Sequence, residues 1–161
     1  MSESLREKKT IRIEMVSKPW VAIEAIGERG SVSIAYKLDN LYVDSLTISD
    51  EMSYSSTILN LLKKLLSKNS FTTLDIQGLI LVNGPGSFTG LRVTNGLVHG
   101  LSEGLNCPVF CTTAFEIYAF AWHCQNENFC KANESFIEVL IDARLNEYYR
   151  GIVLCKKNSI Q

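Results

Sequence analysis

The chain has 161 residues, of which 46% are apolar and 20% are charged, and its 16 basic and 17 acidic side chains give a formal net charge of -1. A chain of this length and composition can bury enough apolar surface to fold, which excludes intrinsic disorder for most of it. The balanced charge supplies no broad positive field, which argues against a protein that binds nucleic acid by itself.

The N-terminal segment is rich in charged side chains and contains no apolar stretch typical of a secretion signal. No part of the sequence approaches the roughly 20 apolar residues of a membrane-spanning helix, so we expect a cytoplasmic protein without membrane contact. The five cysteines are an odd number, which favours buried, reduced thiols over a disulfide framework. Their spacing matches no usual zinc pattern, and we expect no metal site.

The first elements in chain order are three predicted strands. Residues 20–23 are apolar, residues 31–36 alternate as in a half-buried strand, and residues 41–46 follow a polar turn. Two glycines separate the first two strands, so all three should form an antiparallel meander. A helix then follows, because apolar residues recur at helical spacing from residue 58 to residue 66.

Strands and helices alternate in the next part of the chain. Residues 79–82 are apolar without alternation, which is typical of a central strand covered on both faces. We expect a helix over residues 87–105, a short strand at 109–110, and a further helix opened by a capping box of Thr113 and Glu116. This last helix is apolar nearly all round, so it should be buried in the core or against a partner.

A second hairpin is predicted from residues 136–141 and 148–154, with no helix to cover it. The order of elements predicts an α/β, RNase H-like domain with a mixed sheet flanked by helices. We divide the chain into a charged extension (1–19), an RNase H-like subdomain (20–113) and the start of an incomplete second subdomain (114–161).

A glycine-rich segment from Asn83 to Arg92 joins the apolar strand at 79–82 to the helix that follows. Its glycines permit a sharp turn, and Ser87 can cap the helix. The segment could also hold a phosphate at the helix N-terminus. It lacks, however, the Gly-Lys-Ser/Thr ending of a P-loop and the third glycine of the dinucleotide fingerprint. We favour a structural turn and leave the phosphate cradle open.

Three glycines, Gly96, Gly100 and Gly104, recur every fourth residue within that helix. Each costs up to about 1 kcal/mol relative to alanine in a helix interior. Such a stripe forms a groove into which another helix can pack closely. That helix is either residues 58–66 of the same chain or a helix of another subunit, and the stripe alone does not decide between them.

Gly84-Pro-Gly-Ser-Phe-Thr-Gly-Leu-Arg92, followed by the glycine-spaced helix, resembles the hallmark of the TsaB family, also called YeaZ. Ile141-Asp-Ala-Arg144 with Glu147 and Tyr148 is similar to the second signature of that family, and residues 23–35 look like its first hairpin. The resemblance covers roughly residues 20–155. It implies an ASKHA-type, actin-like ATPase fold that has lost its own catalysis, with the second half-domain truncated here.

In the family, TsaB is the dimerisation subunit that supports TsaD, the catalytic subunit, in adding a threonylcarbamoyl group to the adenosine beside the anticodon of tRNA. The resemblance therefore implies a non-catalytic scaffold subunit rather than an enzyme. It implies a TsaD-like partner, a TsaE-like ATPase and, as another possibility, a homodimer. It also implies that tRNA is reached only through the complex and that ATP is used by the complex, with no cofactor assigned to this chain.

The two interface helices of the family correspond here to residues 55–66 and 88–105. The residues assigned to the partner interface are Ser55, Ile58, Leu59, Leu62, Leu66, Val93, Gly96, Leu97, Gly100, Leu101 and Gly104. The residues assigned to the family motif or to a nucleotide contact are Gly84, Gly86, Ser87, Thr89, Gly90, Arg92, Asp142 and Arg144. No catalytic residue is assigned.

The sequence departs from the family pattern where Glu24-Ala25-Ile26 stands in place of an Asp-Thr pair and Tyr54 in place of a histidine. The alternative function is an active phosphotransferase or ATPase of the same fold, with Glu24 as its carboxylate.

Two further enzyme classes fit the sequence less well. A two-metal nuclease would use Glu24 and Asp142, but it would need a further acid where the sequence has Asn83 and Gly84. A peptidase built on Ser87 would need Gly-x-Ser-x-Gly, and this segment has one residue too many after the serine.

Overall fold

The computed structural model describes residues 17–27, 30–48, 54–126, 134–156 and 159–160. Its order of elements agrees with the predicted order, with ends shifted by a few residues. The elements are β1 (Trp20–Glu24), β2 (Ser31–Lys37), β3 (Leu41–Thr47), α1 (Tyr54–Lys68), a 3₁₀ turn η1 (Thr73–Asp75), β4 (Gly78–Val82), α2 (Phe88–Leu105), β5 (Val109–Thr112), α3 (Ala114–Gln125), β6 (Glu134–Arg144), β7 (Glu147–Lys156) and β8 (Ser159–Ile160).

Five strands form the first sheet, in the order β3-β2-β1-β4-β5. The strands β1, β2 and β3 are antiparallel neighbours, which confirms the predicted meander. After the α1 crossover, β4 pairs in parallel with β1, and β5 pairs in parallel with β4. The middle strand is therefore β1, and β4, expected to be central, lies one position from the edge. This mixed sheet with flanking helices is an α/β, RNase H-like arrangement.

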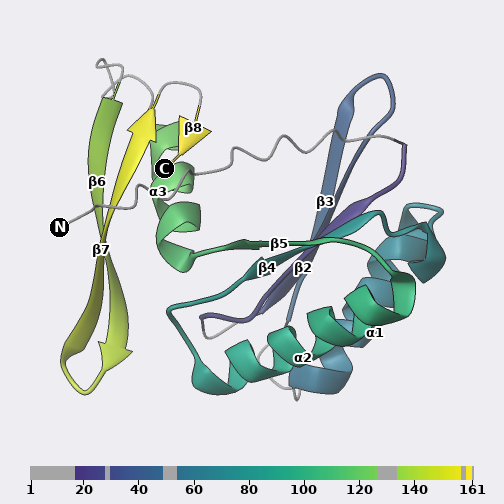
Figure 1. Cartoon of the computed structure of the whole chain (residues 1–161), viewed down its shortest axis with the longest axis horizontal. Helices are drawn as coiled ribbons and strands as arrows, with labels where there is room; N and C mark the ends of the chain where they lie inside the picture. The colour runs from purple at the N-terminus through teal and green to yellow at the C-terminus, as the bar shows by residue number, and fades with distance from the viewer. Residues whose placement is uncertain (1–16, 28–29, 49–53, 127–133, 157–158, 161) are drawn as a thin grey trace, which may run out of the picture.

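One face of the first sheet is covered by α1 and α2, which lie side by side in Figure 1. The buried side chains of β1, β2 and β4 meet those of the two helices in a single apolar core. Burial of each large aliphatic side chain stabilises the fold by roughly 1.5–3 kcal/mol. The largest fully buried members of this core are Val21, Ile23, Val32, Ile34, Ile58, Leu62, Leu65, Leu66, Leu79 and Val98.

A second, smaller sheet has the order β6-β7-β8, and all its pairings are antiparallel. It packs on α3 through a separate apolar cluster that contains Ala119, Val139, Val153 and Cys155. The expectation that no helix covers this hairpin is therefore wrong. The covering helix precedes the hairpin in the chain, whereas the expectation concerned only the residues that follow the hairpin. The domain boundaries proposed from the sequence stay a prediction.

Against the rest of the described structure, the helix α3 buries only one side. Phe115 packs against the second cluster, but Tyr118, Phe120 and Trp122 are each about half exposed. Of the two expected environments of this helix, burial in the core on all sides is wrong, and burial against a partner stays a prediction. Its apolar residues exceed what a small two-layer unit can cover, so several of them face outward.

Only two of the cysteines in the described residues are buried in the two apolar clusters. Cys107 and Cys155 are buried as expected, whereas Cys111 and Cys124 are exposed, so the expectation is wrong for these two. Cys111 lies on the edge strand β5 and Cys124 in the last turn of α3, and neither position faces a core. Cys130 lies outside the described residues. Among the helices in the described ranges, none is long and apolar enough to cross a membrane.

Candidate functional site

The glycine loop, residues 84–90, runs from the end of β4 into the first turn of α2 and lies against the residues that follow β1. The backbone of Gly84 has a φ of 69°, in the left-handed region that glycine adopts without strain. The N–H of Ser87 donates to the carbonyl oxygen of Ile26 at 2.8 Å. The hydroxyl oxygen of Ser87 accepts from the N–H of Gly90 at 3.2 Å, which confirms Ser87 as the cap of α2.

Two loop glycines are required by close packing rather than by a ligand. A β-carbon on Gly86 would lie 2.4 Å from the carbonyl oxygen of Ile26, and one on Gly90 would lie 1.9 Å from that of Ala25. Real β-carbons do not approach backbone oxygens so closely. The glycines thus let the loop contact the backbone that directly follows β1, which is the structural turn favoured from the sequence.

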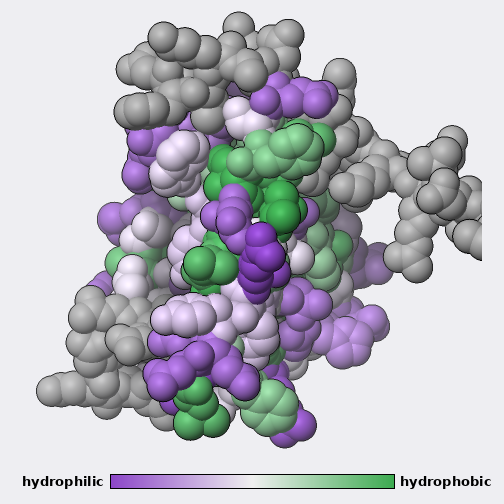
Figure 2. All heavy atoms as spheres, turned by 90° about the vertical axis from the view of Figure 1, so that its left-hand side faces the viewer, coloured by the Kyte–Doolittle hydropathy of each residue, from purple (hydrophilic) through white to green (hydrophobic). Residues whose placement is uncertain are grey.

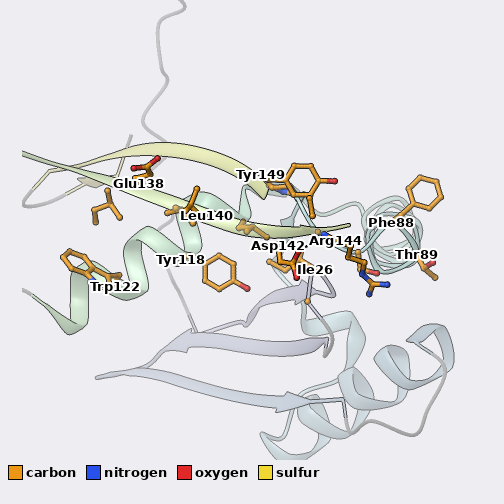
Figure 3. Close-up of a pocket in the computed structure, with 18 of the residues that line it drawn as sticks. Ile26, Phe88, Thr89, Tyr118, Trp122, Glu138, Leu140, Asp142, Arg144 and Tyr149 are labelled. Atoms are coloured by element: carbon orange, nitrogen blue, oxygen red, sulfur yellow. Dashed lines mark hydrogen bonds between the residues drawn. The ribbon is translucent and has the colours of Figure 1, made fainter. Parts of the chain in front are cut away.

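A cleft of about 1370 Å³ lies between the glycine loop, α3 and β6. Figure 3 shows Tyr118 and Trp122 entering it from α3, with β6 on the opposite side and Asp142 and Arg144 near Ile26. The cleft is the candidate site, because it brings together residues from both halves of the chain. Its lining residues are Ile26, Gly27, residues 85–89, Tyr118, Trp122, Gln125, residues 137–144 and Tyr149.

The predicted nucleotide contacts divide into two groups. Gly86, Ser87 and Thr89 line the cleft together with Asp142 and Arg144. By contrast, Gly84, Gly90 and Arg92 do not line it. The guanidinium carbon of Arg92 lies 4.2 Å from the centre of the Phe88 ring, a cation–π contact on the exposed side of α2. Phe88 itself lines the cleft, so Arg92 lies beside a lining residue without being one, and its predicted contact with a phosphate stays a prediction.

The carboxylates near the cleft are engaged by neighbouring groups. Asp142 accepts from the backbone N–H of Arg144 at 2.7 Å, and this bond supports a turn in which residues 144–146 all have positive φ. Glu138 forms an ion pair with Arg150 of β7. Glu24, the carboxylate of the alternative ATPase, accepts from the N–H of Ile26 at 3.2 Å and is not among the lining residues. Within the described ranges, no three His, Cys, Asp or Glu side chains group as a metal site would require.

The residues assigned to a partner interface fall into three environments. Ile58, Leu62 and Leu66 are fully buried in the core, so they are not on the surface and their assignment to an interface is wrong for this fold. Val93, Leu97 and Leu101 are partly buried against the same core, and Leu59 is half-buried. The side chain of Ser55 lies outside what the structure describes.

The glycine stripe, Gly96, Gly100 and Gly104, is exposed along α2. A β-carbon added at any of these positions would meet nothing within 4 Å. The helix α1 therefore does not fill the groove. Of the two partners left open by the sequence, the helix of the same chain is excluded.

Four residues that line the cleft are absent from the sites predicted from the sequence: Tyr118, Trp122, Leu140 and Tyr149. The signal for two of them was present, because α3 carries more apolar residues than one buried face needs. Leu140 and Tyr149 sit in strands whose alternation predicts burial of one face but does not indicate which strand edge lies beside another unit.

A family model described as TsaD, tRNA N6-adenosine threonylcarbamoyltransferase, matches residues 49–158. The Haemophilus influenzae tRNA threonylcarbamoyladenosine biosynthesis protein TsaB is 31% identical over 140 residues, covering 85% of this chain and 54% of that protein. TsaB from Buchnera aphidicola subsp. Schizaphis graminum is 30% identical over 132 residues, covering 81% of this chain and 58% of the relative. The chain thus spans little more than half the length of these relatives.

Solved structures agree on the fold. YeaZ from Pseudomonas aeruginosa superposes with a TM-score of 0.74 at 22% identity, covering 89% of this chain and 63% of that one. This likeness supports the ASKHA-type reading of the two sheets, which the family-model match also supports. Together with the glycine loop that packs on β1 and opens α2, these matches lead to one conclusion: the chain belongs to the TsaB (YeaZ) family.

Proposed function

We propose that this chain acts in tRNA threonylcarbamoyladenosine biosynthesis as a non-catalytic dimerisation subunit that supports a TsaD-like catalytic subunit. The names of its relatives place those proteins in this biosynthesis. In this proposal the chain contacts tRNA only through the complex, a TsaE-like ATPase joins the complex, and ATP is consumed there. A second copy of the chain is the other candidate for the same surface.

The open glycine stripe on α2 carries the proposal. Glycine in a helix interior is unfavourable by up to about 1 kcal/mol relative to alanine, and nothing in the described part of the chain packs on these three positions. A helix of another subunit could approach the α2 backbone closely along this groove. The partly buried Val93 and Leu97, with Leu59 of α1, would supply apolar area beside it.

The test is Gly100→Leu in the full chain, mixed with the TsaD-like subunit of the same organism. A leucine at this exposed position projects into solvent in the free chain, so the melting temperature should stay unchanged or rise slightly. In the complex the same side chain would hold the partner helix away. We expect at least a tenfold loss of association, about 1.4 kcal/mol, by light scattering and titration calorimetry.

His99→Leu is the matched control. It places a leucine at another exposed position of α2, which is rotated by about 100° from Gly100 around the helix axis. It should leave association within about twofold, well under 1.4 kcal/mol. Equal loss in both variants, or full association of Gly100→Leu, would contradict the stripe as the contact surface.

The non-catalytic part of the proposal has its own test. The purified chain should show negligible ATP hydrolysis. Glu24 already accepts a hydrogen bond from the backbone N–H of Ile26, and β6 lines the cleft with two acidic side chains, Glu138 and Asp142. Metal-dependent hydrolysis that disappears in Glu24→Ala would instead favour the active ATPase.

A further inference from the structure

The strand β3 forms one edge of the first sheet and carries exposed apolar side chains. Among the described residues it pairs with β2 alone, and the β2–β3 hairpin stands out from the sheet in Figure 1. Leu38, between the two strands, is 59% exposed, and Leu41 and Val43 of β3 are 58% and 64% exposed. On the side of the second sheet, by comparison, Figure 2 shows apolar residues interleaved with polar ones. An apolar edge strand is a template for association with other chains unless the protein blocks it.

The backbone hydrogen bonds of the hairpin show which groups of β3 face the free edge. The N–H of Ile48 donates to the C=O of Gly30 at 2.8 Å, and the N–H of Leu38 donates to that of Asn40 at 3.2 Å. Opposite residues in an antiparallel pair alternate between hydrogen-bonded and non-hydrogen-bonded pairs. Since β2 and β3 keep one register, the even-numbered residues of β3 bond to β2. The N–H and C=O groups of residues 41, 43, 45 and 47 therefore point away from the sheet.

One of these outward groups is already bonded by a side chain. The N–H of Ser45 donates to Oδ1 of Asp44 at 2.9 Å. The other carboxylate oxygen, Oδ2, lies 2.8 Å from Nζ of Lys68 and accepts from Nδ2 of Asn69 at 2.9 Å. The bonds with Lys68 and Asn69 hold the pKa of Asp44 below its usual value, so near neutral pH the carboxylate is ionised and only accepts hydrogen bonds. The end of α1 thus fixes this carboxylate beside the strand edge.

The bonded N–H is the one that a second copy of β3 would need. Two copies of an edge strand can pair about a twofold axis, and their ladder must join outward groups of both strands. A register with Val43 opposite Val43 places Ser45 opposite Leu41 at both ends, so both ends use the Ser45 N–H. A register centred on Asp44 would bring two carboxylates opposite each other, which is unfavourable. A register centred on Tyr42 joins only residues 41 and 43 and gives a shorter ladder.

We propose that Asp44 keeps the β3 edge from pairing with a second copy of this chain, because its carboxylate holds the Ser45 N–H that the pairing would use. Leu41 and Val43 lie on the same face of the strand, so without this block their side chains would add apolar contact to the main-chain hydrogen bonds. The contact would join two first sheets edge to edge. It does not involve the glycine stripe, which lies on α2, so the inference stands apart from the proposed function.

The test compares Asp44→Ala with Asp39→Ala in the full chain. Both variants remove one carboxylate from the β2–β3 hairpin, so the net charge changes equally, but Asp39 lies in the exposed turn and leaves the Ser45 N–H bonded. In Asp44→Ala, hydrogen–deuterium exchange of residues 41–47 should slow by about tenfold as the chain concentration rises past the dimer dissociation constant. In Asp39→Ala and in the unaltered chain, exchange of these residues should not depend on concentration. Because the readout is local to β3, association through α2 does not interfere.

A double variant separates edge pairing from aggregation of unfolded chains. Val43→Lys, added to Asp44→Ala, places two lysines opposite each other at the centre of the paired register. Exchange of residues 41–47 should then no longer depend on concentration. A further measurement needs no variant: in the unaltered chain, the amide of Ser45 should exchange about tenfold more slowly than that of Val43, which faces the same edge.

Several results would overturn the proposal. Exchange in Asp44→Ala that ignores concentration would show that the freed edge does not pair. Equal slowing in Asp39→Ala would assign the effect to net charge, and slowing that persists in the double variant would assign it to aggregation. Equal exchange of Ser45 and Val43 in the unaltered chain would show that the carboxylate does not hold the N–H. Slow exchange of all outward amides at every concentration would assign the edge to another segment of the chain.

Discussion

Gly90 packs so closely against Ala25 that a β-carbon on the glycine would lie 1.9 Å from the carbonyl oxygen of Ala25. The obstacle is backbone, so it cannot rotate aside as a flexible side chain would. Gly90→Ala should therefore separate α2 from the end of β1 and destabilise the fold by about 1–3 kcal/mol or more. The midpoint of urea unfolding, compared with that of the unaltered chain, measures this effect.

Gly96→Ala should have the opposite effect, because a β-carbon at Gly96 meets nothing within 4 Å. Alanine favours the helix over glycine by up to about 1 kcal/mol, so the urea midpoint should rise. The two variants make the same chemical change in one helix. If both lowered the midpoint by similar amounts, close approach to β1 would not be the reason that Gly90 is a glycine.

Thiol reactivity should follow burial. Burial raises the pKa of the Cys107 thiol above its usual value, and Cys155 is also buried. Cys111 and Cys124 are exposed, and the thiolate is the reactive form. Iodoacetamide at about pH 8 should therefore modify Cys111 and Cys124 first, and the other two only after unfolding. Peptide mapping by mass spectrometry measures each rate; modification of Cys107 as fast as Cys111 would show that the first core is open.

Asp44 should make stability depend on pH. Its carboxylate lies 2.8 Å from the ammonium of Lys68 and accepts from the side-chain amide of Asn69 at 2.9 Å, and these bonds hold its pKa below its usual value. The folded pKa is thus lower than the unfolded one. The stability that Asp44 contributes is therefore present above the unfolded pKa of about 4 and is lost as pH falls through the folded pKa.

Denaturant unfolding of Asp44→Asn at several pH values tests this prediction. The variant should be less stable than the unaltered chain near neutral pH, and the difference should shrink as the solution is acidified. Asp75, whose pKa is also lowered by its bonds with Thr72, is present in both proteins and cancels in the comparison. A difference that does not change with pH would assign the effect to lost packing instead.

Much of the fold was predictable because periodicity and turn residues are local signals. The apolar run before Gly84 indicated a buried strand, and Ser87 and Thr113 marked the starts of α2 and α3 correctly. The covering of the hairpin by α3 was not predictable in the same way. It depends on which of two cores a helix joins, and an all-round apolar helix gives no preferred face.

The candidate site was only partly predictable for a related reason. Gly86, Ser87 and Thr89 share a loop, so their common location followed from the sequence. Their meeting with Asp142 and Arg144 depends on contacts across some 50 residues of chain. Ile58 and Leu62 were assigned to a partner because the family resemblance gives their helix to an interface, and helical spacing, which identifies an apolar stripe, does not show what the stripe packs against.

Two backbone hydrogen bonds of the glycine loop connect the two halves of the chain. The N–H of Ala114, at the start of α3, donates to the carbonyl oxygen of Gly84 at 2.7 Å, and the N–H of Ser87 donates to that of Ile26 at 2.8 Å. One short loop is therefore hydrogen-bonded both to the helix that carries the second sheet and to the segment that directly follows β1, the middle strand of the first sheet. A displacement of α3 must either break the Ala114 bond or carry the loop along. Strain applied to one sheet consequently reaches the other through the short backbone segment from Gly84 to Ser87.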